Sequence, residues 1–285
     1  MDVSIIVPMQ AEEAPHLPGC LAGVFAQRYQ GGRMETLVAQ YGGGPAPAVA
    51  PPGQGELRML AVGDPTPYAA RNAAAAAAQG EALLFTEPGC VPDPDWVAAH
   101  VERLGAGKAT LSVGHVVPAR MTRLVEILLA YENVRDEWVF SSSRWQHYFG
   151  RPKNMAVARR RFESHGPFAE VARGADSKLV QKVAREASCD EIALTPRAVV
   201  RQQSIRGLPS FLRDRFDHAH ALQVHQSAHA APITLADRTG IFRETVRRHG
   251  LGPLQSATLL ALLAAGILTF RAGGRAGDLA RKLRQ

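Results

Sequence analysis

Residues 68–97 read YAARNAAAAAAQGEALLFTEPGCVPDPDWV, and this stretch decides the fold that the sequence predicts. After Arg71 and Asn72, residues 73–79 are almost entirely alanine, the strongest helix former, and Gly80 is expected to end the helix in a left-handed conformation. Residues 82–86 form a short apolar run typical of a buried strand. Glu87 follows at the carboxyl end of that strand, where open α/β sheets bind their ligands, so it is a candidate site residue.

The segments around this stretch alternate between strand and helix patterns. Residues 17–27 carry apolar side chains at helical spacing. Apolar runs that predict buried strands occupy residues 3–7 (VSIIV), 34–39 and 57–62. Further helices are expected over 96–104 and 121–140, and further strands over 109–116 and 191–201. This alternation predicts a parallel sheet with right-handed crossovers, and hence a nucleotide-binding α/β domain at the N-terminus.

Three sets of residues resemble the family-2 glycosyltransferases, which have the GT-A fold. The central set is Ala70-Arg71-Asn72-Ala73, Leu83-Leu84-Phe85, Cys90-Val91-Pro92-Asp93 and Trp96. Residues 3–21 are similar to the family's opening VSVIVPVYNEEANLPRCL, and residues 149–168 (FGRPKNMAVARRRFESHGPF) to its G-x-x-N-M-A-x-R-R segment. The resemblance implies a Rossmann-like α/β fold, with a mostly parallel sheet flanked by helices and a C-terminal helical tail. It also implies transfer of a sugar from a nucleotide-sugar donor to an acceptor hydroxyl, with inversion.

The resemblance also assigns roles to single residues. Asp176, in GADSKLVQKV, matches the family's catalytic base, which takes the proton of the attacking hydroxyl. The residues implied to bind the donor are Pro8, Glu12, Tyr41, Arg71, Asn72, Glu87, Arg206 and Arg213, and those on the acceptor side are Asn154 and Met155. Three structural alternatives stay open: Asp176 as a helix N-cap, Tyr41 as a surface loop residue, and the arginines as a solvated or lipid-facing surface.

The motifs that hold the donor and its metal in the family are incomplete in this chain. The D-x-D motif reads Glu87-Pro88-Gly89, and Gln10, Gln40 and Ala175 replace further family residues. The resemblance implies a divalent metal, Mn or Mg, at Glu87, whereas the loss of the second acid argues against one. Asp93 and Asp95 are candidate substitute ligands, and His225 and His229 have helical i, i+4 spacing without a third ligand. The alternative function is a weak or inactive relative that serves as a scaffold partner of another transferase.

Charge and composition narrow the class of partner. The chain has 285 residues, a net charge of +7 and a pI near 9.7, which favours an anionic partner such as a nucleotide diphosphate or an anionic lipid. Neither a zinc-finger spacing nor an aromatic-basic pattern occurs in the sequence, so no nucleic acid is expected. No G-x-G-x-x-G follows the first apolar run, which disfavours a Rossmann dehydrogenase. Three scattered cysteines and no evident signal peptide indicate a cytoplasmic protein.

The C-terminal region combines an apolar segment with arginines. Residues 254–270 (LQSATLLALLAAGILTF) are shorter and more interrupted than the ~20 apolar residues of a spanning helix. Arginines on both sides suit a helix at an anionic membrane surface, and a packed core or dimer helix is the competing interpretation. We therefore expect a peripheral protein at the inner face of the bacterial plasma membrane, acting on an envelope, polysaccharide or lipid-linked acceptor. The expected division is a transferase domain over 1–200, a basic lid and helices over 201–250, and a C-terminal helix over 251–285.

Overall fold

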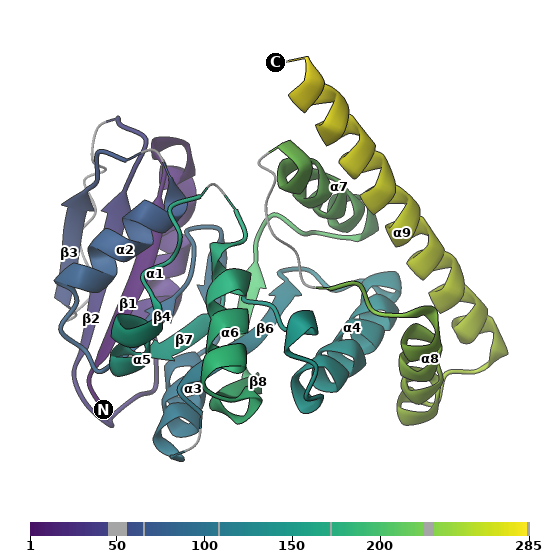
Figure 1. The fold of residues 1–285 in the computed structure, drawn as a ribbon, viewed down its shortest axis with the longest axis horizontal. Coiled ribbons are helices and arrows are strands. Elements are labelled where there is room, and N and C mark those ends of the chain that lie inside the picture. Colours follow the sequence, from purple (N-terminus) through teal and green to yellow (C-terminus); the bar gives the residue numbers. More distant parts are fainter. Residues whose placement is uncertain (45–55, 65, 108, 172, 225–230, 284–285) are drawn as a thin grey trace. The chain divides into compact units, whose positions relative to one another are not determined.

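The structure is a computed structural model that describes residues 1–44, 56–64, 66–107, 109–171, 173–224 and 231–283 (Figure 1). The chain divides into two compact units. The first comprises Met1–Val117 and Tyr148–Gln202, and the second comprises Pro118–His147 and Gln203–Gln285. Residues 118–147 therefore group with the C-terminal helices, which the division expected from the sequence did not include.

An eight-stranded sheet with the order β3-β2-β1-β4-β7-β6-β8-β5 forms the centre of the first unit. Its strands are β1 (Val3–Met9), β2 (Met34–Gln40), β3 (Glu56–Ala61), β4 (Ala82–Phe85), β5 (Cys90–Pro92), β6 (Leu111–Pro118), β7 (Met155–Ala158) and β8 (Ile192–Gln202). β1 pairs in parallel with β2 and β4, and β2 with β3, whereas β4–β7, β6–β7 and β5–β8 are antiparallel. The predicted α/β fold is confirmed, with a mixed rather than a mostly parallel sheet.

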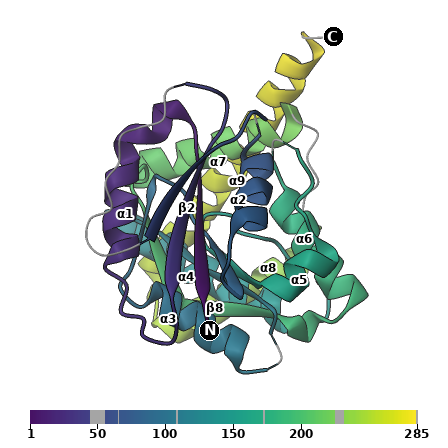
Figure 2. The ribbon, with the colours of Figure 1, turned by 90° about the vertical axis from the view of Figure 1, so that its left-hand side faces the viewer.

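Helices cover both faces of this sheet. They are η1 (Ala11–His16), α1 (Leu17–Phe25), α2 (Pro67–Ala77), α3 (Trp96–Gly105), α5 (Arg159–His165), α6 (Ala175–Glu186) and the short turn η3 (Cys189–Glu191). Figure 2 shows α1 and α2 on opposite sides of β2. Successive side chains of β1 point to opposite faces of the sheet. Val3, Ile5 and Val7 point into the core that α1 lines, and the residues between them point to the other face.

The alanine-rich helix α2 begins at a side-chain cap and ends earlier than predicted. The Thr66 hydroxyl accepts a hydrogen bond from the backbone N–H of Ala69 (3.2 Å), and the last helical residue is Ala77. Gly80 does not have a positive φ, so its predicted left-handed role is wrong. A Cβ at Gly80 would lie 2.5 Å from the backbone nitrogen of Ser4, so glycine is required because β1 passes this close.

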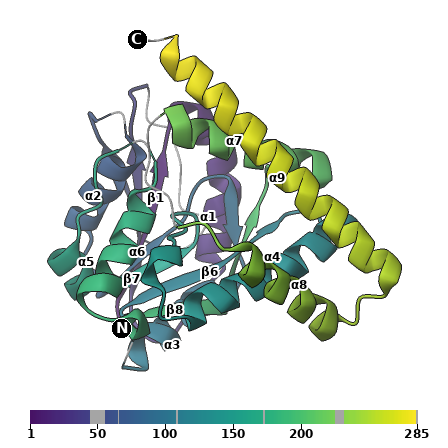
Figure 3. The ribbon, with the colours of Figure 1, turned by 45° about the vertical axis from the view of Figure 1, so that its right-hand side comes forward.

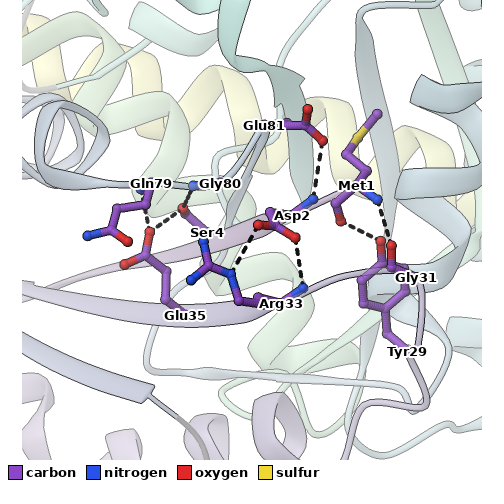
Figure 4. Close-up of polar contacts among 10 residues, drawn as sticks. All are labelled: Met1, Asp2, Ser4, Tyr29, Gly31, Arg33, Glu35, Gln79, Gly80 and Glu81. Carbon is purple, nitrogen blue, oxygen red and sulfur yellow. Dashed lines mark hydrogen bonds and ion pairs between the residues drawn. The ribbon is translucent and has the colours of Figure 1, made fainter.

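Polar contacts close the amino-terminal edge of the sheet (Figure 4). The buried Glu35 accepts hydrogen bonds from the Ser4 hydroxyl (2.6 Å) and from the backbone N–H of Gln79. The Ser4 hydroxyl in turn accepts one from the Gly80 N–H (2.8 Å), and the Asp2 carboxylate accepts one from the Arg33 N–H (2.9 Å). These groups satisfy one another, so their role is to fix the strand ends.

The second unit is helical. Its elements are α4 (Arg123–Ser141), η2 (Trp145–His147), α7 (Leu208–Val224), α8 (Leu235–His249) and α9 (Pro253–Lys282). Figure 3 shows α9 running along α7. These two helices approach closely at glycines of α9, because a Cβ at Gly273 would lie 2.3 Å from the Phe216 carbonyl oxygen and one at Gly277 would lie 2.5 Å from that of His220.

Candidate active site

The carboxyl ends of the parallel strands β1, β2 and β4 meet at one edge of the sheet. In their register Met9 pairs with Gln40, and Ile6 with Phe85. Tyr41 directly follows β2, and its N–H donates to the Met9 carbonyl (3.0 Å). Glu87 follows β4 after one residue. The chain therefore leaves three neighbouring strands at the edge where α/β proteins bind ligands, as the sequence predicted.

Arg71 of α2 places a buried positive charge at this edge. Its side chain is 1% exposed, and its Nη2 donates to Glu87 Oε1 (2.7 Å). Nη1 donates to the Pro67 carbonyl (3.2 Å), and the guanidinium lies 5.1 Å from the centre of the Tyr68 ring. Among the residues that the structure describes, Arg71 Nε has no hydrogen-bond partner. One N–H donor of the buried Arg71 side chain therefore makes no hydrogen bond, and an unsatisfied buried donor of this kind is uncommon enough to need an explanation.

Asp176 lies at the start of α6. Its side chain contacts Tyr68 of α2, the helix that also carries Arg71. Its carboxylate accepts a hydrogen bond from the Tyr68 hydroxyl and a longer one (3.4 Å) from the Ser177 hydroxyl. The N-cap of α6 is Gly174, at φ 81°, so the N-cap interpretation of Asp176 is wrong. Gly150 permits the packing, because a Cβ there would lie 2.7 Å from the Asp176 Cβ.

Burial raises the pKa of Asp176, although the Tyr68 hydroxyl and the Arg71 charge oppose the shift. A carboxylate with a raised pKa is a stronger proton acceptor, which is what a general base requires. Glu87, Arg71, Tyr68 and Asp176 are thus joined by a continuous series of side-chain contacts, which we call the Arg71 cluster.

Tyr41 and Glu13 accompany the Arg71 cluster. Tyr41 is 8% exposed, so its interpretation as a surface residue is wrong. Burial raises the pKa of Tyr41 to about 12, and the charges of Glu13, Arg71 and Glu87 act on it as well. Burial also raises the pKa of Glu13, and Glu87 raises it further. Tyr41 directly follows β2, and Glu13 belongs to η1 just after β1, so both lie at the carboxyl edge of the sheet where the cluster lies.

Sequence reasoning missed Tyr68, Glu13 and Arg173. Tyr68 stands three residues before Arg71 on α2, and this spacing puts both side chains on one face of the helix. The spacing was therefore a signal from which Tyr68 could have been predicted. The sequence singled out Glu12, which is exposed, whereas the half-buried Glu13 responds to the charge of Glu87. Arg173 lowers the pKa of Tyr41 through its charge. No local sequence pattern indicates that the loop before α6 brings it there.

Four predicted site residues make structural contacts within the fold, and the donor-binding roles predicted for Asn72 and Pro8 stay predictions. Asn72 holds the backbone of Phe168, donating to its carbonyl (2.8 Å) and accepting from its N–H (3.0 Å). Pro8 is buried within β1, beyond the last β1–β4 pair. Met155 is fully buried in β7. Asn154 is also fully buried, and its amide bonds to four protein groups. The side chains of Asn154 and Met155 therefore offer no surface to an acceptor.

Arg206 and Arg213 belong to the second unit, and both are exposed. The Arg206 backbone N–H donates to the Ser210 hydroxyl (2.8 Å) at the start of α7. The part in donor binding predicted for Arg206 and Arg213 stays a prediction.

The residues at the carboxyl end of β4 do not fit a divalent metal. Glu87 is ion-paired with Arg71, and the substitute candidates are occupied as well: Arg201 binds both oxygens of Asp93 and Arg28 both oxygens of Asp95. The described residues contain no group of three or more His, Cys, Asp or Glu side chains that could hold a metal. His225 and His229 lie outside the described residues.

Two cavities of the first unit lie away from the cluster. One is at the amino-terminal edge of the sheet, beside Arg33 and Glu35. The other is lined by Gly107, Thr110, Arg160, Arg161, Ser164 and Glu191. In this conformation the Tyr68 hydroxyl covers Asp176, which is 5% exposed.

The fold is similar to that of solved glycosyltransferases, although no protein-family model and no curated protein matches the sequence. The mannosyltransferase PcManGT from Pyrobaculum calidifontis, in complex with GDP-Man and Mn²⁺, has a TM-score of 0.56 at 19% identity, over 99% of this chain and 86% of that one. Residues 1–349 of S. aureus TarS, in complex with UDP-GlcNAc, give 0.51 at 13%, over 99% and 89%. A mycobacterial protein gives 0.51 at 18%, over 80% and 76%.

Because the sequence identities to these structures are 13–19%, the structural likeness establishes the fold of this chain alone. The shared fold extends over nearly the whole of this chain in two of these structures. The chain therefore has the GT-A fold of the glycosyltransferases.

Proposed function

We propose that this chain is an inverting, family-2-type glycosyltransferase that moves a sugar from a nucleotide-sugar donor to an acceptor hydroxyl. The observation that carries the proposal is the Arg71 cluster, in which an acid of raised pKa, Asp176, is joined to the carboxyl edge of the sheet at Glu87. Two of the similar solved structures are complexes with GDP-Man and with UDP-GlcNAc, which supports a nucleotide-sugar donor.

Asp176 is the proposed general base. The acceptor oxygen attacks the anomeric carbon, and a new C–O bond forms as the bond from that carbon to the donor's phosphate oxygen breaks. The hydroxyl proton passes to the Asp176 carboxylate, and the nucleoside diphosphate leaves with the bonding electrons. Positioned proton transfer of this kind contributes roughly 10²- to 10⁴-fold to a rate. The Tyr68 hydroxyl orients the base and gives way to the acceptor.

The leaving diphosphate needs positive charge, and this chain carries it on arginines. Arg71 lies at the carboxyl edge of β4 with a spare buried N–H, and Arg173 lies close enough for its charge to act on Tyr41. Guanidinium groups match phosphate oxygens in geometry. Because the acids at this edge do not fit a metal, we propose donor binding that does not depend on Mn²⁺ or Mg²⁺. Arg206 and Arg213 are proposed as further donor contacts.

The proposed acceptor is a glycan or lipid-linked glycan of the cell envelope, reached from the inner face of the plasma membrane. The support is the basic charge of the chain together with α9, which among the described residues is the one helix long and apolar enough to cross a membrane and has 11% of its apolar window buried.

A second function is favoured by one observation, the burial of Asp176 beneath Tyr68. If the acceptor never displaces Tyr68, the chain keeps the fold without the reaction and serves as a binding partner of an active transferase. The Arg71–Glu87 ion pair is compatible with this role, because it needs no ligand to be satisfied.

Calorimetry of the purified chain against UDP-, GDP- and dTDP-sugars, in EDTA and in Mn²⁺, tests the proposal. We expect binding of one donor class with the same affinity in both buffers, and about a tenfold loss or more in Arg71→Met. Arg103→Met, at an exposed position of α3, is the matched control. Absence of binding to every donor would favour the scaffold function, and binding only in Mn²⁺ would contradict the metal-independent site.

A further inference from the structure

The exposed face of α9 carries an apolar segment followed by a basic one. Leu260, Ile267 and Leu268 are 55%, 42% and 65% exposed, and Leu254, at the start of the helix, is 81% exposed. Further along the helix, Arg271 and Arg275 are exposed. Residues 260, 264, 267, 268, 271 and 275 recur at helical spacings of three and four, so they share one face. We call this face, including Leu279 and Lys282 beyond it, the α9 face.

The opposite face of α9 is occupied by its own unit. Leu259 and Leu262 are buried in the core that α4, α7 and α8 share. Gly273 and Gly277 bring α9 against the backbone of α7, at Phe216 and His220. The α9 face is therefore left uncovered by the core of this unit.

α9 is the one described helix that is long and apolar enough to cross a membrane by length and composition, and 11% of its apolar window is buried. Its packing argues against crossing. α7 lies along it and carries charged side chains such as Asp214 and Arg215, which are costly inside a bilayer. A helix that is bound to a polar helix on one side, and apolar and basic on the other, suits the plane of the membrane surface.

The charge of the α9 face selects the partner. Arg271, Arg275 and Lys282 are exposed on it, and its acid, Asp278, accepts a hydrogen bond from Arg281 (3.1 Å). An anionic lipid surface fits both the apolar and the basic part of the α9 face. The leucines can contact the acyl chains, and the arginines can pair with the anionic headgroups. A second copy that presents the same face would cover the apolar part, but it would set Arg271, Arg275 and Lys282 against one acid, Asp278, which Arg281 already binds.

We propose that the α9 face is a docking surface for an anionic bilayer, with α9 lying in the interface plane. Leu260, Ile267 and Leu268 insert between the lipids, while Arg271 and Arg275 contact the phosphate groups. The inference concerns the second unit alone, so it stands or falls independently of glycosyl transfer. It places the protein at the surface where a lipid-linked or envelope acceptor would be found.

Co-sedimentation of the full chain with vesicles tests the surface. We expect binding to vesicles of equal parts phosphatidylglycerol and phosphatidylcholine, and little binding to phosphatidylcholine alone. The double variant Leu260→Asp/Leu268→Asp should lose binding, and Arg271→Glu should weaken it about tenfold or less, since one arginine near the surface is replaced by an acid. The matched controls on α8 are Leu235→Asp, at an 81% exposed leucine, and Arg243→Glu, at an exposed arginine; both should bind as the parent chain does.

Three results would overturn the proposal. They are no binding of the parent chain to anionic vesicles, equal binding to both vesicle types, and binding that the α9 variants leave unchanged. Sedimentation velocity without lipid addresses the competing occupant, because self-association abolished by Leu260→Asp/Leu268→Asp would make the face a dimer interface instead. Circular dichroism confirms that each variant is folded, and donor calorimetry without vesicles keeps the outcome separate from that of the transferase proposal.

Discussion

Two buried polar networks of the first unit differ in completeness, and the difference separates structure from function. The Asn154 network is complete: its Oδ1 accepts from Trp96 Nε1 (2.7 Å) and from His100 Nε2 (2.8 Å), and its Nδ2 donates to the carbonyls of His115 and Ala198 (2.7 and 2.9 Å). The Arg71 cluster is incomplete, because it holds an unpartnered N–H and an acid of raised pKa. A complete network fixes a fold, whereas an incomplete one has capacity left for a ligand.

The largest effect on stability is expected at the complete network. Asn154→Leu leaves four groups without their partner, and each buried unsatisfied group costs about 1–3 kcal/mol. We expect the free energy of unfolding to fall by about 4 kcal/mol or more, measured by urea denaturation. A loss below about 1 kcal/mol would mean that the Asn154 hydrogen bonds do not hold the strands together.

His100 should make the same network sensitive to acid. Burial lowers the pKa of His100 from 6.5 to about 4, so the ring is neutral and accepts at Nδ1 from the Ser112 hydroxyl (2.8 Å). Between pH 6.5 and 4 the unfolded chain binds more protons than the folded one, so stability falls as the pH falls. The shift corresponds to about 3 kcal/mol, and the raised pKa of Asp176 acts in the opposite direction.

Comparison with His100→Gln isolates this contribution. The free energy of unfolding of the parent chain should fall more steeply than that of the variant as the pH is lowered from 6.5 to 4. Parallel curves would show that His100 does not titrate with folding.

Gly150→Ala should disturb the cluster without touching its charges. The new Cβ would lie 2.7 Å from the Asp176 Cβ, so α6 must shift, and overpacking of this kind typically costs about 1–3 kcal/mol. Gly105→Ala is the matched control, because a Cβ there meets nothing within 4 Å. Equal stability of the two variants in urea would contradict the close packing at Asp176.

The smallest change is expected for Tyr68→Phe, which removes one hydroxyl. The hydrogen bond from Tyr68 lowers the pKa of Asp176, so its loss raises that pKa further and moves the acid limb of the rate profile to higher pH. The free energy of unfolding should change by about 1 kcal/mol. Tyr29→Phe, which removes a hydroxyl bound to the Met1 carbonyl, should leave the profile in place.

The sequence predicted much of the fold because local patterns control it. The β-branched run at residues 3–7 and the alanines of α2 decide strand and helix directly. The antiparallel half of the sheet was not foreseen, because pairing between β4, β7 and β6 depends on contacts distant in sequence.

The candidate site was predictable in part. Arg71 and Glu87 are near each other in sequence and flank one strand, so their shared edge followed from the strand–helix pattern. The contact between Tyr68 and Asp176 joins residues 108 positions apart, which no periodicity reveals. For Asn154 the resemblance to the family implied a place on the acceptor side, whereas its side chain is fully buried and makes four hydrogen bonds within the protein.

The most direct test of the account is transfer by Asp176→Asn with a donor that the parent chain binds. If Asp176 takes the acceptor proton, the variant keeps its affinity for the donor while turnover falls by at least about 100-fold, and Asp190→Asn, at an exposed position of η3, transfers normally. Normal turnover by Asp176→Asn would contradict the assignment of the base, and with it the catalytic meaning of the Arg71 cluster.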